Sequence, residues 1–453
     1  MKKASLMNDY LNRYAAGLPW KLQAGNLENI EQVVVIPAYA EKELLFATLA
    51  SLAANNDASL GKALILCVIN NKAAASLADK ENNAQTLAVL SALLNKHAFS
   101  KLALADDLHF SVQKIADRPL RLGYIDASSN GMEIPSRLGG VGMARKIGMD
   151  MALRLLTNPG SGQRLILSLD ADTLVQPDYL SAVQNIFSSG KTQTGVVEYE
   201  HQMPLNAIER SAICYYEIFL RYWVLGLQYA QSPYAFHSIG STIVTTADSY
   251  LAVRGMNRRG AGEDFYFLNK LAKIGPIRQI SETVVYPSAR ISRRVPFGTG
   301  AAIEKIVSGA SLEISLYDPR IFNILREWIA VMKQSFNCSE NQIITKAWEI
   351  DPGLRTFLVA RGFLSVWPKI RQNLKEHKTY ERQFHNWFDG FETLKLVNYL
   401  TKEFYPRISL ISALKKILEM QNKEFPGRMP DEDFPEAEDE MRVLGYIRGR
   451  FKR

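Results

Sequence analysis

The run Leu165-Ile-Leu-Ser-Leu-Asp-Ala-Asp-Thr-Leu-Val-Gln-Pro-Asp178 joins an apolar stretch of strand length to two aspartates one residue apart. Side chains at i and i+2 of an extended chain point to the same face, so Asp170 and Asp172 are expected to share one ion. Carboxylate oxygens suit Mg²⁺ or Mn²⁺, which commonly also bind substrate phosphates. A bare Asp-x-Asp is common by chance, and the alternative is a pair of solvated loop carboxylates. The flanking sequence has to decide between the two.

Two other apolar runs precede this one and predict the sheet to which it belongs. They are residues 32–38, Gln-Val-Val-Val-Ile-Pro-Ala, and residues 63–69, Ala-Leu-Ile-Leu-Cys-Val-Ile. Continuous apolar strands that alternate with helices are typical of a parallel sheet covered on both faces. We therefore expect an α/β fold with a mostly parallel, Rossmann-like sheet. Ligands of such sheets bind outside the carboxyl ends of the strands, where Tyr39, Asn70 and Asp170 fall.

Four later segments are interpreted as additional strands of the same domain. They are residues 108–114, 120–126, 195–200 and 240–246.

Residues 137–150, Arg-Leu-Gly-Gly-Val-Gly-Met-Ala-Arg-Lys-Ile-Gly-Met-Asp, lead into a predicted helix that ends near Leu156. Glycines at a helix start permit close backbone approach, and helix N-terminal amides with Arg145 and Lys146 suit a diphosphate. The alternative is a loop whose glycines serve tight turns while the basic pair is solvated. The segment matches neither a Walker loop nor a dinucleotide-binding motif.

Two further segments carry charge in places where chemistry is expected. Glu263 and Asp264 open a predicted helix that runs to Lys273, although acidic residues in a first turn also serve as simple caps. Residues 288–300 hold three arginines, among them Arg293 and Arg294, before a glycine-bearing loop. This segment is interpreted either as an anion clamp or as a solvated basic loop.

The length of 453 residues predicts more than one domain. We expect an N-terminal arm over 1–30, an α/β domain over 31–300, and a mainly helical domain over 301–453. The net charge of +8 favours an anionic ligand. A basic DNA-binding helix and zinc-finger spacing are both missing from the sequence, so nucleic acid is not expected as a partner.

The N-terminal sequence lacks the apolar segment of a signal peptide, and the longest stretch without Lys, Arg, Asp or Glu, Tyr222 to Ala247, contains polar interruptions. A cytoplasmic protein is therefore expected. Contact with the inner face of the membrane stays open through the aromatic segment 213–231, which is alternatively a buried helix, and through the basic tail 442–453.

Taken together and in this order, the motifs resemble glycosyltransferase family 2, nucleotide-sugar enzymes of the A-type glycosyltransferase fold. The matching pieces are Val34-Val-Ile-Pro-Ala-Tyr-Ala-Glu41, Gly142-Met-Ala-Arg-Lys-Ile-Gly148, Asp170-Ala-Asp172 and Glu263-Asp264. The resemblance covers about residues 30–300 and leaves the remaining C-terminal part unmatched.

The resemblance implies a nucleotide-sugar donor and Mn²⁺ or Mg²⁺ as cofactor. Asp170 would lie near the ribose and the metal, Asp172 would ligate the metal, and Asp264 beside Glu263 would be the general base. One base that activates an acceptor hydroxyl, with no enzyme nucleophile, predicts inversion at the anomeric carbon. The other residues expected to contact the nucleotide sugar are Pro37, Tyr39, Glu41, Asn70, Arg145, Lys146, Arg293 and Arg294.

Three positions depart from the family pattern. Asn70-Asn71 replaces the usual acidic residue after the second strand, so the base need not be uracil. Lys146 stands where Asn is common, and the late histidine that ligates metal in some members is missing, which leaves His201 or His237 as alternatives.

The acceptor is open among a glycan, a lipid and a small molecule. Alternatives to the transferase are a nucleotidyltransferase on a related fold and a non-catalytic protein that binds sugar or nucleotide.

Overall fold

The computed structural model describes residues 2–17, 19–95, 104–138, 140–156, 163–291, 299–307, 315–372, 374–425 and 437–449. The chain forms two compact units. The sheet unit comprises residues 1–202 and 238–288, and the helical unit comprises residues 203–237 and 289–453.

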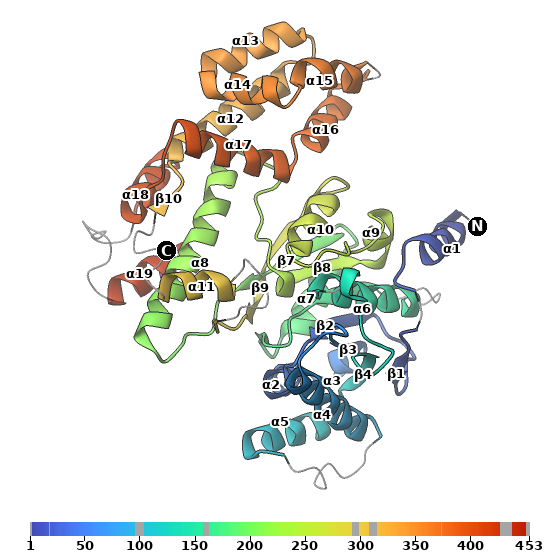
Figure 1. Ribbon diagram of the computed structural model, residues 1–453. Coiled ribbons are helices and arrows are strands. Elements are labelled where there is room, and N and C mark those ends of the chain that lie inside the picture. Colours follow the sequence, from blue (N-terminus) through green and yellow to red (C-terminus); the bar gives the residue numbers. More distant parts are fainter. Residues whose placement is uncertain are drawn as a thin grey trace. The chain divides into compact units, whose positions relative to one another are not determined.

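The sheet unit is built on one sheet, whose described strands follow the order β1-β4-β3-β2-β5-β8-β7-β9-β6 (Figure 1). The strands are β1 (Leu22–Ala24), β2 (Gln32–Ala38), β3 (Ala63–Asn70), β4 (Arg121–Ala127), β5 (Leu165–Ser168), β6 (Leu174–Val175), β7 (Thr194–Tyr199), β8 (Ile243–Thr246) and β9 (Arg278–Tyr286). All residues of β2, β3 and β5 are buried, as expected for central strands covered on both faces.

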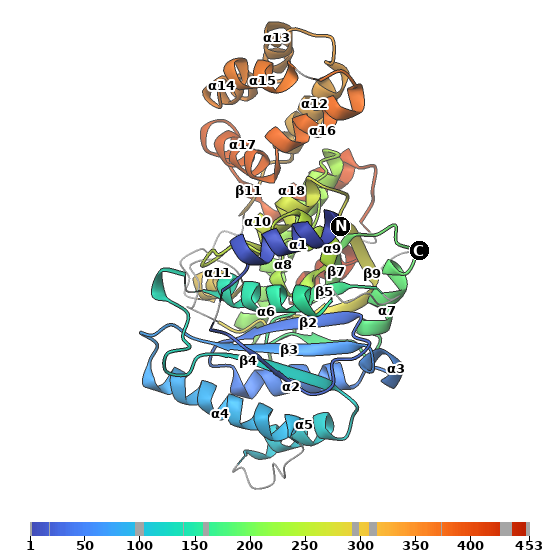
Figure 2. The same cartoon turned by 90° about the vertical axis from the view of Figure 1, so that its right-hand side faces the viewer.

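The helices of the sheet unit cover both faces of this sheet. They are α1 (Lys2–Arg13), α2 (Lys42–Ala53), α3 (Asp57–Leu60), α4 (Leu77–Leu94), α5 (Asp106–Ala116), α6 (Val141–Leu155), α7 (Tyr179–Phe187), α9 (Ala247–Ala252) and α10 (Glu263–Ala272). Figure 2 shows α6 on one side of β2 and β3, and α2 and α4 on the other. The chain moves outward from β2 to β4 and then returns to β5, and right-handed crossovers, the rule for parallel strands, place the connecting helices of these two directions on opposite faces.

The expectation of a mostly parallel sheet is wrong, because the sheet is mixed. β2, β3, β4 and β5 are parallel to their neighbours within this group, but β8 is antiparallel to both β5 and β7. The chain leaves the sheet unit after Gln202 and re-enters at Ser238, so β8 does not follow β7 by the direct crossover that would make the two parallel.

The strand predicted at residues 108–114 is also wrong, because this segment lies inside α5. Its buried apolar residues are Leu108, Val112 and Ile115, and the spacing of four and three is that of one helix face. Asp106 and Asp107 occupy the first turn, where negative charge is favoured by the helix dipole. The other three predicted segments overlap the strands β4, β7 and β8.

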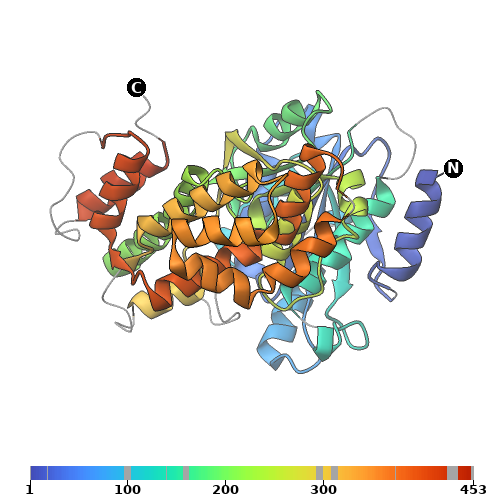
Figure 3. The same cartoon turned by 90° about the horizontal axis from the view of Figure 1, so that it is seen from above.

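The helical unit contains most of the remaining helices and a two-stranded ladder. Its elements are α8 (Ala207–Tyr229), α11 (Thr299–Val307), α12 (Pro319–Gln334), α13 (Glu340–Ile350), α14 (Pro352–Ala360), α15 (Phe363–Arg371), α16 (His377–Trp387), α17 (Gly390–Glu403), α18 (Leu410–Met420), α19 (Ala437–Ile447), β10 (Ser315–Leu316) and β11 (Ile408–Ser409). Figure 3 shows the orange helices of this unit lying side by side. Their core is strongly aromatic, with Trp328 and Trp367 both fully buried.

The two compact units divide the chain differently from the expected domains, and the last boundary follows Ser288 instead of residue 300. Residues 203–237, expected in the α/β domain, belong to the helical unit, because buried side chains of α8 such as Tyr222 pack against Phe322 of α12. The arm over 1–30 belongs to the sheet unit, where Tyr10 is 2% exposed. The segment 213–231 therefore contributes to the core of the helical unit, in agreement with its interpretation as a buried helix.

None of the described helices combines the length and apolar character that a membrane-spanning segment needs.

Candidate functional site

Asp170 and Asp172 lie at the carboxyl end of β5, directly after the buried strand. They sit in a turn in which the Thr173 amide donates to the Asp170 carbonyl at 3.2 Å, and not on the extended chain that the spacing suggested. The turn is fastened from two sides, since Thr48 Oγ1 donates to the Ala171 carbonyl at 2.9 Å and Gln202 Nε2 donates to the Asp172 carbonyl at 3.0 Å. Both carboxylates stay partly exposed, so both are accessible to a ligand.

Arg145 joins the three motifs that are far apart in the sequence. Its side chain, 2% exposed, forms ion pairs with Asp170 after β5 and with Glu263 in the first turn of α10. Burial lowers the pKa of this guanidinium, but the carboxylates of Asp170, Glu263 and Asp264 outweigh burial and raise it. Arg145 is therefore a fixed cation that organises the acidic side chains, and its charge is already balanced by them.

Asp264 is the residue of this cluster whose protonation is most changed by its surroundings. Burial, together with the charge of Glu263, raises the pKa of Asp264 to about 7, although Arg145 and the Phe265 amide, which donates to Oδ1 at 2.7 Å, act in the opposite direction. A free aspartate has a pKa of about 3.9 and is fully ionised at neutral pH. A carboxylate with a pKa of about 7 is a stronger base than a free aspartate.

The glycines at the start of α6 serve the close approach of another loop. A Cβ on Gly140 would lie 2.6 Å from the Gly260 Cα, and a Cβ on Gly142 would overlap the Arg259 carbonyl and touch Glu263. Gly240 has the same function beside Arg145, because a Cβ there would lie 2.5 Å from its Nη2 atom. These glycines allow α6 to pack closely against the acidic pair. The sequence had suggested two other roles for them, diphosphate binding and tight turns.

Lys146 points away from this cluster. Its ammonium group, 2% exposed, forms an ion pair with Asp150 at 3.1 Å and donates to the Tyr10 hydroxyl at 3.0 Å. Successive residues of a helix face different directions, about 100° apart, so Arg145 and Lys146 cannot serve one ligand as a basic pair. Of the two residues, the structure brings only Arg145 to the carboxylates.

The loop after β2 lies at the same edge of the sheet, and α4 holds it. Tyr39 donates through its hydroxyl to Asp79 Oδ2 at 2.9 Å, and the Ala40 amide donates to Asn83 Oδ1 at 2.9 Å. Ala40 has a φ of 49°, in the left-handed region where a side chain is strained. Pro37 is the penultimate residue of β2, and Glu41 is the buried residue that precedes α2.

Asn70 ends β3 beside this loop. Its Nδ2 donates to the Ala38 carbonyl at 2.9 Å and to the Val68 carbonyl at 3.2 Å, so the amide fixes the end of β2. The sequence interpretation missed Asn83, whose Nδ2 donates to the Asn70 carbonyl and to Asn71 Oδ1, both at 3.0 Å. The Asn82-Asn83 pair inside a helix, where asparagine is unfavourable, was the available signal.

Asp170 and Asp172 fit a divalent cation only in part. Over the described ranges, no three His, Cys, Asp or Glu side chains gather as a ligand set. Mg²⁺ is commonly held by one or two carboxylates, with substrate phosphates and water completing the shell. Two partly exposed carboxylates match that type of site, although Arg145 already occupies Oδ1 of Asp170.

The remaining predicted residues are two arginines and two histidines. Arg293 and Arg294 fall outside the described residues. His201 is buried and packs edge-on against Tyr199, with ring centroids 5.4 Å apart. His237 belongs to the helical unit, and burial and Arg221 lower its pKa to about 3.

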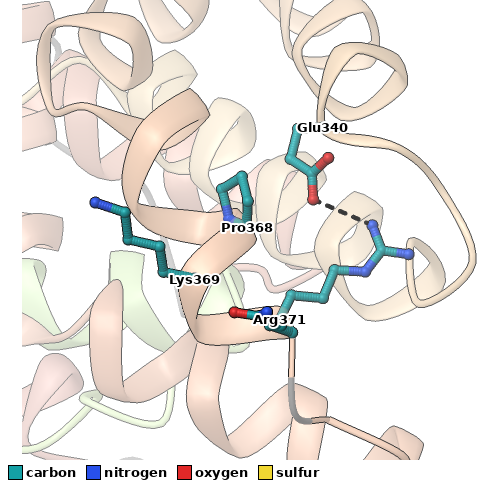
Figure 4. Close-up of a pocket in the computed structure, with 5 residues that line it drawn as sticks. Glu340, Pro368, Lys369 and Arg371 are labelled. Carbon is teal, nitrogen blue, oxygen red and sulfur yellow. Dashed lines mark hydrogen bonds and ion pairs between the residues drawn. The ribbon is translucent and has the colours of Figure 1, made fainter.

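A separate open hollow lies within the helical unit and is lined by Glu340, Pro368, Lys369, Arg371 and Gln372 (Figure 4). Its volume is about 520 Å³, and Arg371 is paired with Glu340 at 3.4 Å. The acidic cluster of the sheet unit contributes no residue to it.

No protein-family model and no curated protein matches this chain. Among solved structures, it is similar to S. aureus TarS 1-349 in complex with UDP-GlcNAc, with 12% identity over 89% of this chain and 95% of that chain and a TM-score of 0.37. It is also similar to the mannosyltransferase PcManGT from Pyrobaculum calidifontis in complex with GDP-Man and Mn²⁺, with 14% identity over 99% of this chain and 95% of that one and a TM-score of 0.34. At these values no residue role and no activity passes from them to this chain.

Proposed function

We propose that the protein is a metal-dependent glycosyltransferase of the A-type, family 2 kind, which moves a sugar from a nucleotide diphosphate to an acceptor hydroxyl. The observation that supports this most is the position of Arg145, which joins Asp170 of the proposed donor site to Glu263 of the acidic pair. A donor site and a general base have to lie side by side for direct transfer, and this guanidinium holds their residues together.

Asp264 is proposed as the general base. Its pKa of about 7 makes it able to take a proton from an acceptor hydroxyl at neutral pH while a new bond forms at the anomeric carbon. The bond from that carbon to the nucleoside diphosphate breaks at the same time. Attack without an enzyme nucleophile inverts the configuration of the anomeric carbon.

A divalent cation is proposed at Asp170 and Asp172. One guanidinium lies among the carboxyl groups of Asp170, Glu263 and Asp264, so the cluster is acidic and would repel a diphosphate. Mg²⁺ or Mn²⁺ would supply the positive charge that stabilises the departing diphosphate. Pro37, Tyr39, Glu41 and Asn70, at the same sheet edge, are proposed to contact the base and ribose.

The direct test is to incubate the purified protein with Mn²⁺ and a panel of nucleotide sugars. Release of nucleoside diphosphate in the presence of a hydroxyl acceptor is the expected result. Release of pyrophosphate would instead indicate a nucleotidyltransferase, and binding without release would indicate a non-catalytic protein.

Two variants separate the proposed roles within that assay. Asp264→Asn should retain donor binding and lose at least about 100-fold in turnover, the usual contribution of a general base. Asp172→Asn should weaken the Mn²⁺-dependent part of donor binding. Full turnover of Asp264→Asn, or unchanged metal-dependent affinity of Asp172→Asn, contradicts the assignment concerned.

A further inference from the structure

The loop of residues 253–262, called here the acidic-pair loop, leads directly into Glu263 and Asp264 and has an unusual backbone. Arg254, Gly255 and Gly262 have φ values of 57°, 66° and 68°, all in the left-handed region. For a non-glycine residue such as Arg254 this conformation is strained, and it persists only where neighbouring groups fix it. The contacts of the loop therefore decide where the acidic pair lies.

The N-terminal segment supplies several of these contacts. α1 lies beside α9 in the sheet unit (Figure 1), and the segment just after it reaches the loop. Arg258 Nη2 donates to the carbonyls of Tyr14 and Ala15, each at 3.2 Å. The Arg254 guanidinium lies 4.9 Å from the centre of the Tyr14 ring. Two of the three arginines of the loop, Arg254 and Arg258, are thus in contact with residues 14–15.

Tyr10 packs against the first residues of the acidic-pair loop. The side chain is 2% exposed, and its ring meets Tyr250 edge-on with centroids 6.1 Å apart. A Cβ added to Gly255 would overlap the Tyr10 hydroxyl, so this hydroxyl lies directly over the Gly255 backbone. The glycine is needed here both for its positive φ and for the tyrosine that covers it.

Asp150 of α6 is the point at which the N-terminal segment is attached. This buried carboxylate accepts hydrogen bonds from the Tyr10 hydroxyl at 2.5 Å, the Tyr250 hydroxyl at 2.6 Å and the Ala16 amide at 2.6 Å. Lys146 adds an ion pair. A buried charge is tolerated only when it is bonded in this way, so removal of one donor weakens the whole attachment.

The acidic-pair loop also contacts α6 and α10, the helices that carry Arg145 and Asp264. Gly140, just before α6, and Gly142 in its first turn lie against residues 257–260, as described above. Lys270 of α10 donates to the carbonyls of Val253, at 3.0 Å, and Gly255. The acidic-pair loop is therefore in contact with the N-terminal segment, α6 and α10.

We infer that residues 2–17 act as a strap that fixes the acidic-pair loop, with Tyr10 as a positioning residue for Asp264. The strap itself rests only on these contacts, and its effect on turnover rests on the proposed function. Loss of the Tyr10 hydroxyl should loosen the loop and displace Asp264, while the donor residues after β2 and β5 stay in place.

The test compares Tyr10→Phe and Tyr10→Ala with two control variants. Tyr179→Phe removes the buried hydroxyl of another tyrosine of the sheet unit, for which no hydrogen-bond partner is present among the described residues. Leu6→Ala removes a 62% exposed side chain from α1. Hydrogen exchange of residues 253–262 should become about tenfold faster in Tyr10→Phe, as expected for one lost bond to a charged group, and faster still in Tyr10→Ala.

Steady-state kinetics supply the second readout. Tyr10→Phe should lower kcat about tenfold with an unchanged KM for the nucleotide sugar, whereas both controls should match the unmodified protein. If the loop exchanges at its original rate in folded Tyr10→Phe and Tyr10→Ala, the strap is refuted. If the unmodified protein transfers no sugar, the proposed function fails, but hydrogen exchange still decides whether the strap exists.

Discussion

Asp264 couples the proposed chemistry to the stability of the protein. Its folded-state pKa of about 7 lies above the value of about 3.9 for a free aspartate, so the folded protein binds the proton more tightly between these pH values. By linkage, this group lowers the stability of the fold as the pH rises from about 4 to about 7. The ionised carboxylate is the destabilising form.

Asp264→Asn should therefore stabilise the protein at high pH. An amide carries no charge, so the variant should have a higher Tm than the unmodified protein at pH 8 and nearly the same Tm at pH 4.5. Thermal unfolding followed by circular dichroism across this range measures the difference. Glu282→Gln, which alters an exposed ion pair with Arg278, is the control and should show no such pH dependence. An equal Tm at pH 8 would contradict the raised pKa.

At the scale of single residues, the sequence indicated which side chains carry charge at the sheet edge but not all of their partners. Asp170 and Asn70 could be placed there because each follows an apolar strand. The contacts of Lys146 could not be predicted, since its partner Tyr10 is 136 positions away in the sequence. The burial that raises the pKa of Asp264 depends on tertiary packing in the same way.

At the scale of elements, the position of α6 on the sheet depends on a glycine inside the helix. Gly148 faces β2 and β3, and a Cβ there would overlap Val35 Cγ1 and lie 2.9 Å from Val68 Cγ2. The sequence motif that contains Gly148 suggested ligand binding, whereas the structure assigns this glycine to packing. Strand order and direction, in contrast, could not be predicted from apolar runs, because such a run does not show which strands pair. β8 follows an excursion of the chain into the helical unit and is antiparallel to β5.

Gly148→Ala should destabilise the protein by about 1–2 kcal/mol. Alanine gains up to about 1 kcal/mol in a helix interior, but overpacking costs about 1–3 kcal/mol, and the overlap with two valines makes the second effect larger. Urea unfolding followed by circular dichroism gives the free energy of unfolding. Gly275→Ala is the matched control, because a Cβ at Gly275 meets nothing within 4 Å. A gain in stability for Gly148→Ala would show that α6 is not packed this closely.

At the scale of the whole molecule, the helical unit has its own buried charge network. Glu217 of α8, fully buried, binds Arg448 through both carboxylate oxygens, at 2.7 and 2.8 Å, and pairs with Arg221 at 2.8 Å. The segment after α19 is thereby attached to α8. The sequence predicted helices for this region. It did not predict that Arg448, near the C-terminal end, would bind Glu217, which lies 231 positions earlier.

Glu217→Gln should destabilise the helical unit by about 3 kcal/mol or more, because two arginines lose the carboxylate that balances their buried charge. Five of the six tryptophans belong to this unit and only Trp20 to the sheet unit, so tryptophan fluorescence during urea unfolding reports mainly on the helical unit. Glu392→Gln, which alters a pair with the 41% exposed Arg361, should cost about 1 kcal/mol or less. Equal effects of the two variants would contradict a special role for the buried pair.

The order of the sheet also bears on how the protein avoids aggregation. Both outer strands are very short: β1 has three residues and β6 has two, whereas the almost wholly apolar β2 and β3 lie inside. Short outer strands offer few unpaired amides and carbonyls to a second chain. Detachment of β1 would uncover the seven residues of β4 and so expose a longer edge to pairing with a second chain.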